Sequence, residues 1–95
     1  MSKQKINGII FEFIKDIKSD TRVEGCHVKI DGKHYVVLNA GGSLPFGGLS
    51  AYTATRTGKI ENLSAPLFKV NGNNLQDGID KLIVLKAKEA GHIEE

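Results

Sequence analysis

Two histidines and the single cysteine are the side chains of this sequence with the clearest capacity for chemistry. His27 and His34 lie in the stretch CHVKIDGKHYVVL, which begins at Cys26. If this stretch folds as two strands, both imidazoles project from one face and Cys26 from the other. Two imidazoles so placed could share a zinc ion, but no third ligand follows at a suitable spacing. We therefore predict two half-exposed histidines and no metal site.

The sequence offers no complete set of residues for nucleophilic catalysis. A reactive cysteine needs a nearby base and a lowered pKa, whereas Cys26 is predicted on the core face, where a lone cysteine behaves as a small apolar residue. Ser43 lies in a glycine-rich stretch, without the strand-to-helix turn that exposes a nucleophilic serine. We therefore expect a protein with no enzymatic activity and no cofactor.

The stretch NAGGSLPFGG, residues 39–48, is predicted to be a loop because its glycines and proline suit neither a helix nor a strand. The backbone amides of such a loop could cradle a phosphate. The stretch matches neither of the established glycine-rich phosphate-binding patterns. A small-nucleotide site is therefore the alternative hypothesis. Its candidate residues are Gly41, Gly42, Ser43, Gly47, Gly48 and Arg56.

Composition indicates an ordinary globular domain. The 95 residues are 40% apolar and 25% charged, which is enough for one core and one domain, residues 1–95. The net charge of +2 is too small to indicate a nucleic acid or an anionic membrane as partner. No apolar run approaches the roughly 20 residues that span a bilayer. One cysteine suits a reducing compartment, so we expect a cytoplasmic protein.

Asp31-Gly32 predicts the turn of a β-hairpin, because a two-residue loop needs positive φ, which glycine adopts freely. This turn fixes the register of the two strands: Ile30 faces Lys33, Val28 faces Tyr35 and Cys26 faces Val37. One face of the hairpin is then apolar. The other face carries His27, Lys29, His34, Val36 and Leu38.

The N-terminal region predicts an amphipathic helix. Its apolar residues recur at helical spacing, at Ile6, Ile9, Ile10, Phe13, Ile14 and Ile17. Phe11 lies off this stripe, at the edge of the polar arc. We therefore take Phe11 as a candidate contact residue.

The remaining chain predicts two more strands, a short edge strand and a helix. Residues 51–56 and 59–63 form a second hairpin around Thr57-Gly58, and residues 67–70 form the edge strand. The last helix begins after Asn74, runs over residues 75–90 and ends at Gly91. The predicted fold is α+β: an antiparallel meander of four or five strands with an N-terminal and a C-terminal helix packed on one sheet face.

With both helices on one face, the other face of the sheet is left with exposed apolar residues. Val36 lies there beside His27 and His34. A long loop, a second copy of the chain or a partner could cover such a surface, and we favour the copy or the partner. In the glycine-rich loop, Leu44 and Phe46 flank Pro45 as an apolar tip.

The segment HYVVLN, the glycine-bearing loop and then AYTATRTGKIENLSAP resembles small bacterial immunity proteins of the cystatin or NTF2-like type. In those proteins a leading helix precedes a meander whose last hairpin carries a turn like Thr57-Gly58-Lys59. The resemblance covers about half of the chain and implies a protein that binds and blocks another macromolecule. This chain differs in being mildly basic, whereas many immunity proteins are acidic.

The sequence therefore predicts a small non-enzymatic binding protein that blocks or neutralises a macromolecular partner, as an inhibitor, an immunity protein or a phage counter-defence protein. The partner is expected to be a protein, with a homodimer as a further arrangement. The candidate partner-binding residues are Phe11, His27, His34, Val36, Leu44 and Phe46. A nucleotide-binding protein is the first alternative and a nucleic-acid-binding domain the second, since solvated helix surfaces account for the lysines better.

Overall fold

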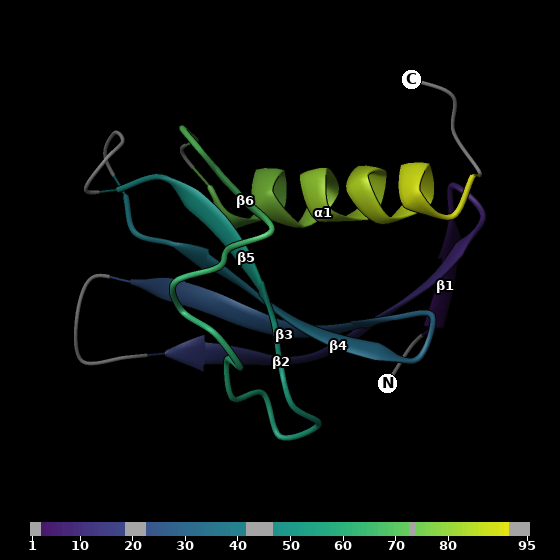
Figure 1. Ribbon diagram of the computed structural model, residues 1–95, viewed down its shortest axis with the longest axis horizontal. Helices are drawn as coiled ribbons and strands as arrows, with labels where there is room; N and C mark the ends of the chain where they lie inside the picture. Colours follow the sequence, from purple (N-terminus) through teal and green to yellow (C-terminus); the bar gives the residue numbers. More distant parts are fainter. Residues whose placement is uncertain (1–2, 19–22, 42–46, 73, 92–95) are drawn as a thin grey trace.

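A computed structural model of the protein describes residues 3–18, 23–41, 47–72 and 74–91. Six antiparallel strands form one sheet in the order of the chain (Figure 1). They are β1 (Lys3–Ile6), β2 (Ile9–Lys18), β3 (Glu24–Ile30), β4 (Lys33–Asn39), β5 (Leu49–Thr53) and β6 (Phe68–Val70). Helix α1 (Leu75–Glu89) follows β6 and is the only helix among the described residues.

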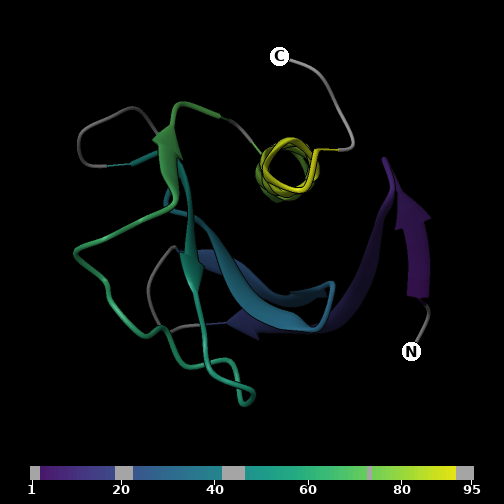
Figure 2. The same cartoon turned by 45° about the vertical axis from the view of Figure 1, so that its right-hand side comes forward.

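The sheet curls around α1. Figure 2 looks nearly along the helix and shows β5 and β6 on one side of it, β3 and β4 beneath it, and β1 on the far side. The concave face of the sheet and the helix enclose the core. Its buried members are Ile9, Phe11, Cys26, Val28, Ile30, Tyr35, Val37, Ala51, Ile79, Leu82, Ile83 and Ala87.

The β3–β4 hairpin has the predicted turn and register. Asp31 and Gly32 have φ values of 48° and 86°, as a two-residue turn with positive φ at both positions requires. Val28 pairs with Tyr35 and Cys26 with Val37. The apolar face of this hairpin lies against α1, so the prediction of its inward face is confirmed.

The predicted N-terminal helix is wrong, because residues 3–18 form the β1–β2 hairpin. Asn7 and Gly8, with φ values of 50° and 85°, make its turn, and Ile6 pairs with Ile9. Asn-Gly is a strong hairpin signal, and isoleucine favours strands over helices. The register of β2 against β3 shifts between Phe13 and Lys15, which marks a β-bulge.

The predicted C-terminal helix is present with its caps. The Asn74 side chain accepts a hydrogen bond of 3.0 Å from the Asp77 amide, and Gly91 follows the helix with φ 80°. The buried face of α1 includes Ile79, Leu82, Ile83 and Ala87, as predicted. Gly78 also faces the sheet: a Cβ there would lie 2.8 Å from Val37 Cγ1. The helix therefore packs more closely at this point than any larger residue would allow.

The second predicted hairpin is present only as its turn. Residues 55–59 form a turn in which the Thr55 amide donates to the Lys59 carbonyl at 2.8 Å. After this turn the chain makes a single bridge, between Ala54 and Ile60. β6 pairs with β5 as the predicted short edge strand. The described residues thus form six strands and one helix, instead of four or five strands and two helices.

Residues 54–67, called here the covering segment, connect β5 to β6 along the convex side of the sheet, opposite α1 (Figures 1 and 2). Gly58 in this segment lies directly on the His27 ring, because a Cβ at Gly58 would lie 3.0 Å from His27 Nδ1. Both faces of the β3–β4 hairpin are therefore packed by the chain itself. None of the described helices is long and apolar enough to cross a bilayer.

Candidate functional site

A groove separates the β1–β2 hairpin from α1 and is the best candidate for a binding site. Its volume is about 400 Å³, within the range of about 300–1,000 Å³ that ligand pockets usually have. Its walls come from both sides of the gap: Gln4, Ile6, Phe11, Phe13, Asp16, Leu75, Gln76, Ile79, Asp80 and Ile83. We call this the hairpin–helix groove.

Local geometry of β2 determines which side chains enter the groove. Phe11 and Phe13 pair with Ile30 and Val28, both of which face the helix, so both aromatic rings project to the concave side. After the bulge, Asp16 pairs with Cys26 and returns to the same side. The bulge therefore places a carboxylate next to two aromatic residues.

The two phenylalanines differ in exposure, and the difference is the reverse of the prediction. Phe11 is only 9% exposed and belongs to the core, whereas Phe13 is 39% exposed at the groove. Under the helical interpretation Phe13 was buried and Phe11 was the contact residue. The Asn7-Gly8 dipeptide was the sequence signal that could have revealed this exchange.

The electrostatic character of the groove is acidic. Asp16 and Asp80 are the charged groups among the described residues that line it, and no lysine or arginine joins them. Burial raises the pKa of the neighbouring Cys26 thiol to about 11, and the negative charge of Asp16 contributes to the rise. The field of Asp16 therefore reaches into the adjoining core. In a chain with a net positive charge, this groove favours cationic groups.

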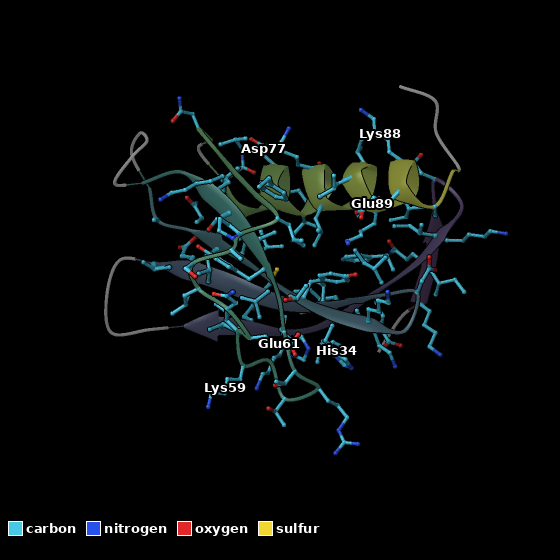
Figure 3. The ribbon with its side chains drawn as sticks, in the orientation of Figure 1. His34, Lys59, Glu61, Asp77, Lys88 and Glu89 are labelled. Carbon is cyan, nitrogen blue, oxygen red and sulfur yellow. The ribbon has the colours of Figure 1, made fainter. Side chains whose placement is uncertain are left out.

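The convex face holds the predicted histidine pair, but that face is not open. His27 Nε2 lies 2.8 Å from His34 Nδ1, and the ring centroids are 4.9 Å apart. Figure 3 shows His34 on the side of the sheet away from α1, together with Lys59 and Glu61 of the covering segment. His27 and Val36 are each only 1% exposed, so the prediction of an uncovered face is wrong for both.

The electrostatics of His27 reflect its burial. Burial lowers the pKa of His27, and the neighbouring His34 and Lys15 lower it further. Its Nδ1 atom has no hydrogen-bond partner. Among the described residues no group of three or more His, Cys, Asp or Glu side chains could hold a metal ion.

The structure describes four of the six residues of the predicted nucleotide site: Gly41, Gly47, Gly48 and Arg56. At the two described ends of the glycine-rich loop, the Ala40 amide donates to the Gly48 carbonyl at 2.9 Å and the Gly48 amide to the Gly41 carbonyl at 3.1 Å. Gly47 and Gly48 are buried. Gly42, Ser43, Leu44 and Phe46 lie outside the described residues.

Arg56 lies away from that loop, at the opposite end of the β4–β5 pair. The loop leaves β4 at Asn39, which pairs with Leu49, whereas Arg56 follows Thr53, which pairs with Tyr35. These two pairs are four positions apart along the strands, a distance of about 13 Å. The described part of the loop and Arg56 therefore do not converge on one phosphate.

Comparison with protein-family models, with curated proteins and with solved structures finds no match. The resemblance to immunity proteins stays a prediction. Conclusions about function therefore rest on the geometry of the groove and of the convex face.

Proposed function

We propose that this protein is a small non-enzymatic binding protein that blocks or neutralises a macromolecular partner, and that it holds the partner in the hairpin–helix groove. The observation that carries the proposal is the half-exposed Phe13 beside the otherwise buried apolar wall of Phe11, Ile79 and Ile83. A few aromatic anchors in a well-packed pocket supply most of the energy at many protein interfaces.

The partner that suits this groove is a protein segment that combines apolar side chains with lysine or arginine. Apolar side chains match the walls formed by Ile6, Phe11, Phe13 and Leu75. Basic side chains match Asp16 and Asp80, which face no cation within the described lining of the groove. Inhibitors, immunity proteins and phage counter-defence proteins act by occupying a partner's surface in this way.

The test compares Phe13→Ala with Ile10→Ala. Both residues lie on β2 and are half-exposed, at 39% and 50%, but Ile10 projects to the opposite face, so Ile10→Ala is a matched control. The partner is captured on the immobilised protein from the source cells, identified by mass spectrometry, purified and titrated calorimetrically. We expect Phe13→Ala to weaken binding about tenfold or more and Ile10→Ala to leave it unchanged.

Two outcomes would overturn the proposal. One is equal affinity of the wild type and Phe13→Ala for the purified partner. The other is a rise of several degrees in melting temperature with a single nucleotide, which would favour the nucleotide alternative. Light scattering across a tenfold dilution measures whether the protein forms a dimer. If it does, and if Phe13→Ala dissociates the dimer, the occupant of the groove is a second copy of the chain.

A further inference from the structure

We propose that the His27–His34 pair is a proton-sensitive latch, which holds the covering segment on the convex face near neutral pH and releases it in mild acid. This inference is independent of the hairpin–helix groove, which lies on the concave side. It rests on the close contact between the two imidazoles, on the burial of His27 and on the position of Gly58.

The hydrogen bond between the rings fixes where the protons are. One proton must lie between His27 Nε2 and His34 Nδ1, which are 2.8 Å apart. His27 Nδ1 is buried and has no acceptor, so a proton there would lose its hydrogen bond to water without replacement. The proton of His27 therefore resides on Nε2 and is donated to His34 Nδ1, and neutral His34 carries its own proton on Nε2.

A further proton cannot be accommodated in the closed arrangement. If it joins His27, it must sit on Nδ1, where no acceptor lies. If it joins His34 at Nδ1, two N–H groups face each other across 2.8 Å unless the His27 proton moves to Nδ1. Both routes end with opposed donors or with a buried N–H lacking an acceptor, and both introduce a poorly solvated charge.

The charged neighbours that act on His27 do not compensate such a charge, because His34 and Lys15 both lower its pKa. The described residues on this side of the sheet include these charged and titratable groups: Lys3 and Lys5 of β1, Glu12 and Lys15 of β2, Lys29 of β3, His34 of β4 and Tyr52 of β5, with Arg56, Lys59 and Glu61 of the covering segment. Glu12 pairs across the strands with Lys29. Lys15 pairs directly with His27 and opposes its protonation.

The covering segment is anchored at both ends: the Ala54 amide donates to the His34 carbonyl at 3.0 Å, and Leu67 packs against the core. Gly58 lies on the His27 ring with φ 89°, while Leu63 is 68% exposed. The Glu61 amide donates to the Thr53 carbonyl at 3.1 Å and the Leu67 amide to the Ala51 carbonyl at 2.7 Å. Removal of Gly58 from the ring would give Nδ1 access to water, so opening is the direct way to solvate a protonated His27.

The direction of the pH effect follows from the lowered pKa of His27. The open state binds a proton near the ordinary histidine pKa of about 6.5, while the closed state resists it. The closed state therefore has its full advantage above that pH and loses it progressively as the pH falls. Opening would expose Val36 and Tyr52, both buried in the closed structure.

The experiment measures amide hydrogen exchange of the wild type at pH 7.5 and pH 5.5, corrected for intrinsic rates. We expect the Glu61 amide to exchange about tenfold faster or more at pH 5.5, while the Leu67 amide, which is anchored at the core, and the amides of β3 and β4 keep their protection. His27→Gln removes the titrating ring and should abolish the acceleration. His34→Gln removes the second ring but retains the unpartnered Nδ1 of His27, so it should reduce the acceleration without abolishing it.

Nitrogen-15 NMR of the imidazoles tests the same proposal in the wild type, even if His27→Gln fails to fold. We expect a neutral His27 with its proton on Nε2 until the covering segment opens. The proposal is overturned if His27 becomes protonated while the Glu61 amide stays protected, or if the neutral ring carries its proton on Nδ1. Equal acceleration in the wild type and His27→Gln would also overturn it.

Discussion

The β1–β2 and β3–β4 hairpins share one kind of turn and differ in what packs against them. Each turn has an Asn or Asp with positive φ followed by glycine. β3 and β4 lie between α1 on one side and the covering segment on the other. β1 is exposed along most of its length, and Ile10 and Phe13 of β2 are half-exposed.

This difference shows that the turn specifies a hairpin, whereas the surrounding elements decide what the hairpin can do. The β3–β4 hairpin forms the centre of the core. The β1–β2 hairpin is attached to it along β2, and also through Asp31, whose carboxylate accepts a 2.8 Å hydrogen bond from the Ile10 amide. The concave surface of the β1–β2 hairpin, which lines the hairpin–helix groove, is where we propose that the partner binds.

The largest expected effect contrasts a core residue with a residue of the outer hairpin. Leu82 is fully buried, and Leu82→Ala should lower the free energy of unfolding by about 3 kcal/mol. Ile6 is partly buried at the edge, so Ile6→Ala should cost about 1 kcal/mol. Urea denaturation measures both. Similar losses would show that the β1–β2 hairpin is as essential to the core as α1.

The next effect concerns thiol reactivity. Because burial and the charge of Asp16 raise the pKa of Cys26 from 9.0 to about 11, the thiolate fraction at pH 7.5 should fall about 100-fold. Alkylation by iodoacetamide should slow at least as much relative to the unfolded chain. A Cys26→Ala/Phe13→Cys variant, with its thiol in the groove, should react far faster. Equal rates would mean that the two hairpins do not differ in protection.

The smallest effect concerns the contact between α1 and β4. Alanine favours a helix over glycine by about 1 kcal/mol, yet Gly78→Ala would place a Cβ 2.8 Å from Val37 Cγ1. We expect a net loss of about 1 kcal/mol. Val84→Ala, on the exposed side of α1, is the control and should be nearly neutral. Stabilisation by Gly78→Ala would indicate that the helix can shift away from the sheet.

Local signals in the sequence were sufficient for β3, β4, β6 and α1. The Asp31-Gly32 turn fixed the register, and Asn74 and Gly91 marked the helix ends. In each of these elements the local preference and the tertiary environment agree, so the pattern could be interpreted without knowledge of the rest of the fold.

The N-terminal hairpin was missed because the bulge in β2 disturbs its alternation. Ile9, Phe11 and Phe13 project to the concave side, but after the bulge Asp16 takes the next such position. With isoleucines on both sides of the strand, the apolar positions also fit a period of 3.6 residues. The turn residues Asn7-Gly8 were the deciding signal, and the helical interpretation did not use them.

The candidate site was less predictable than the fold. Phe13 and Asp16 share the groove only because of the bulge, and α1 supplies the opposite wall from a distant part of the chain. The burial of His27 depends on Gly58, which follows β4 and β5 in the sequence. Contacts of this kind arise from tertiary packing, and no local pattern of residues encodes them.

The order of the strands in the sheet has a consequence for how the chain reaches its native state. Each strand pairs with the one made just before it, so the ladder can grow by adding neighbours as synthesis proceeds. The helix that seals the concave surface comes after all six strands. During translation the nascent sheet would therefore expose its apolar concave face until α1 is made. Chaperone binding or self-association is most favoured at that stage.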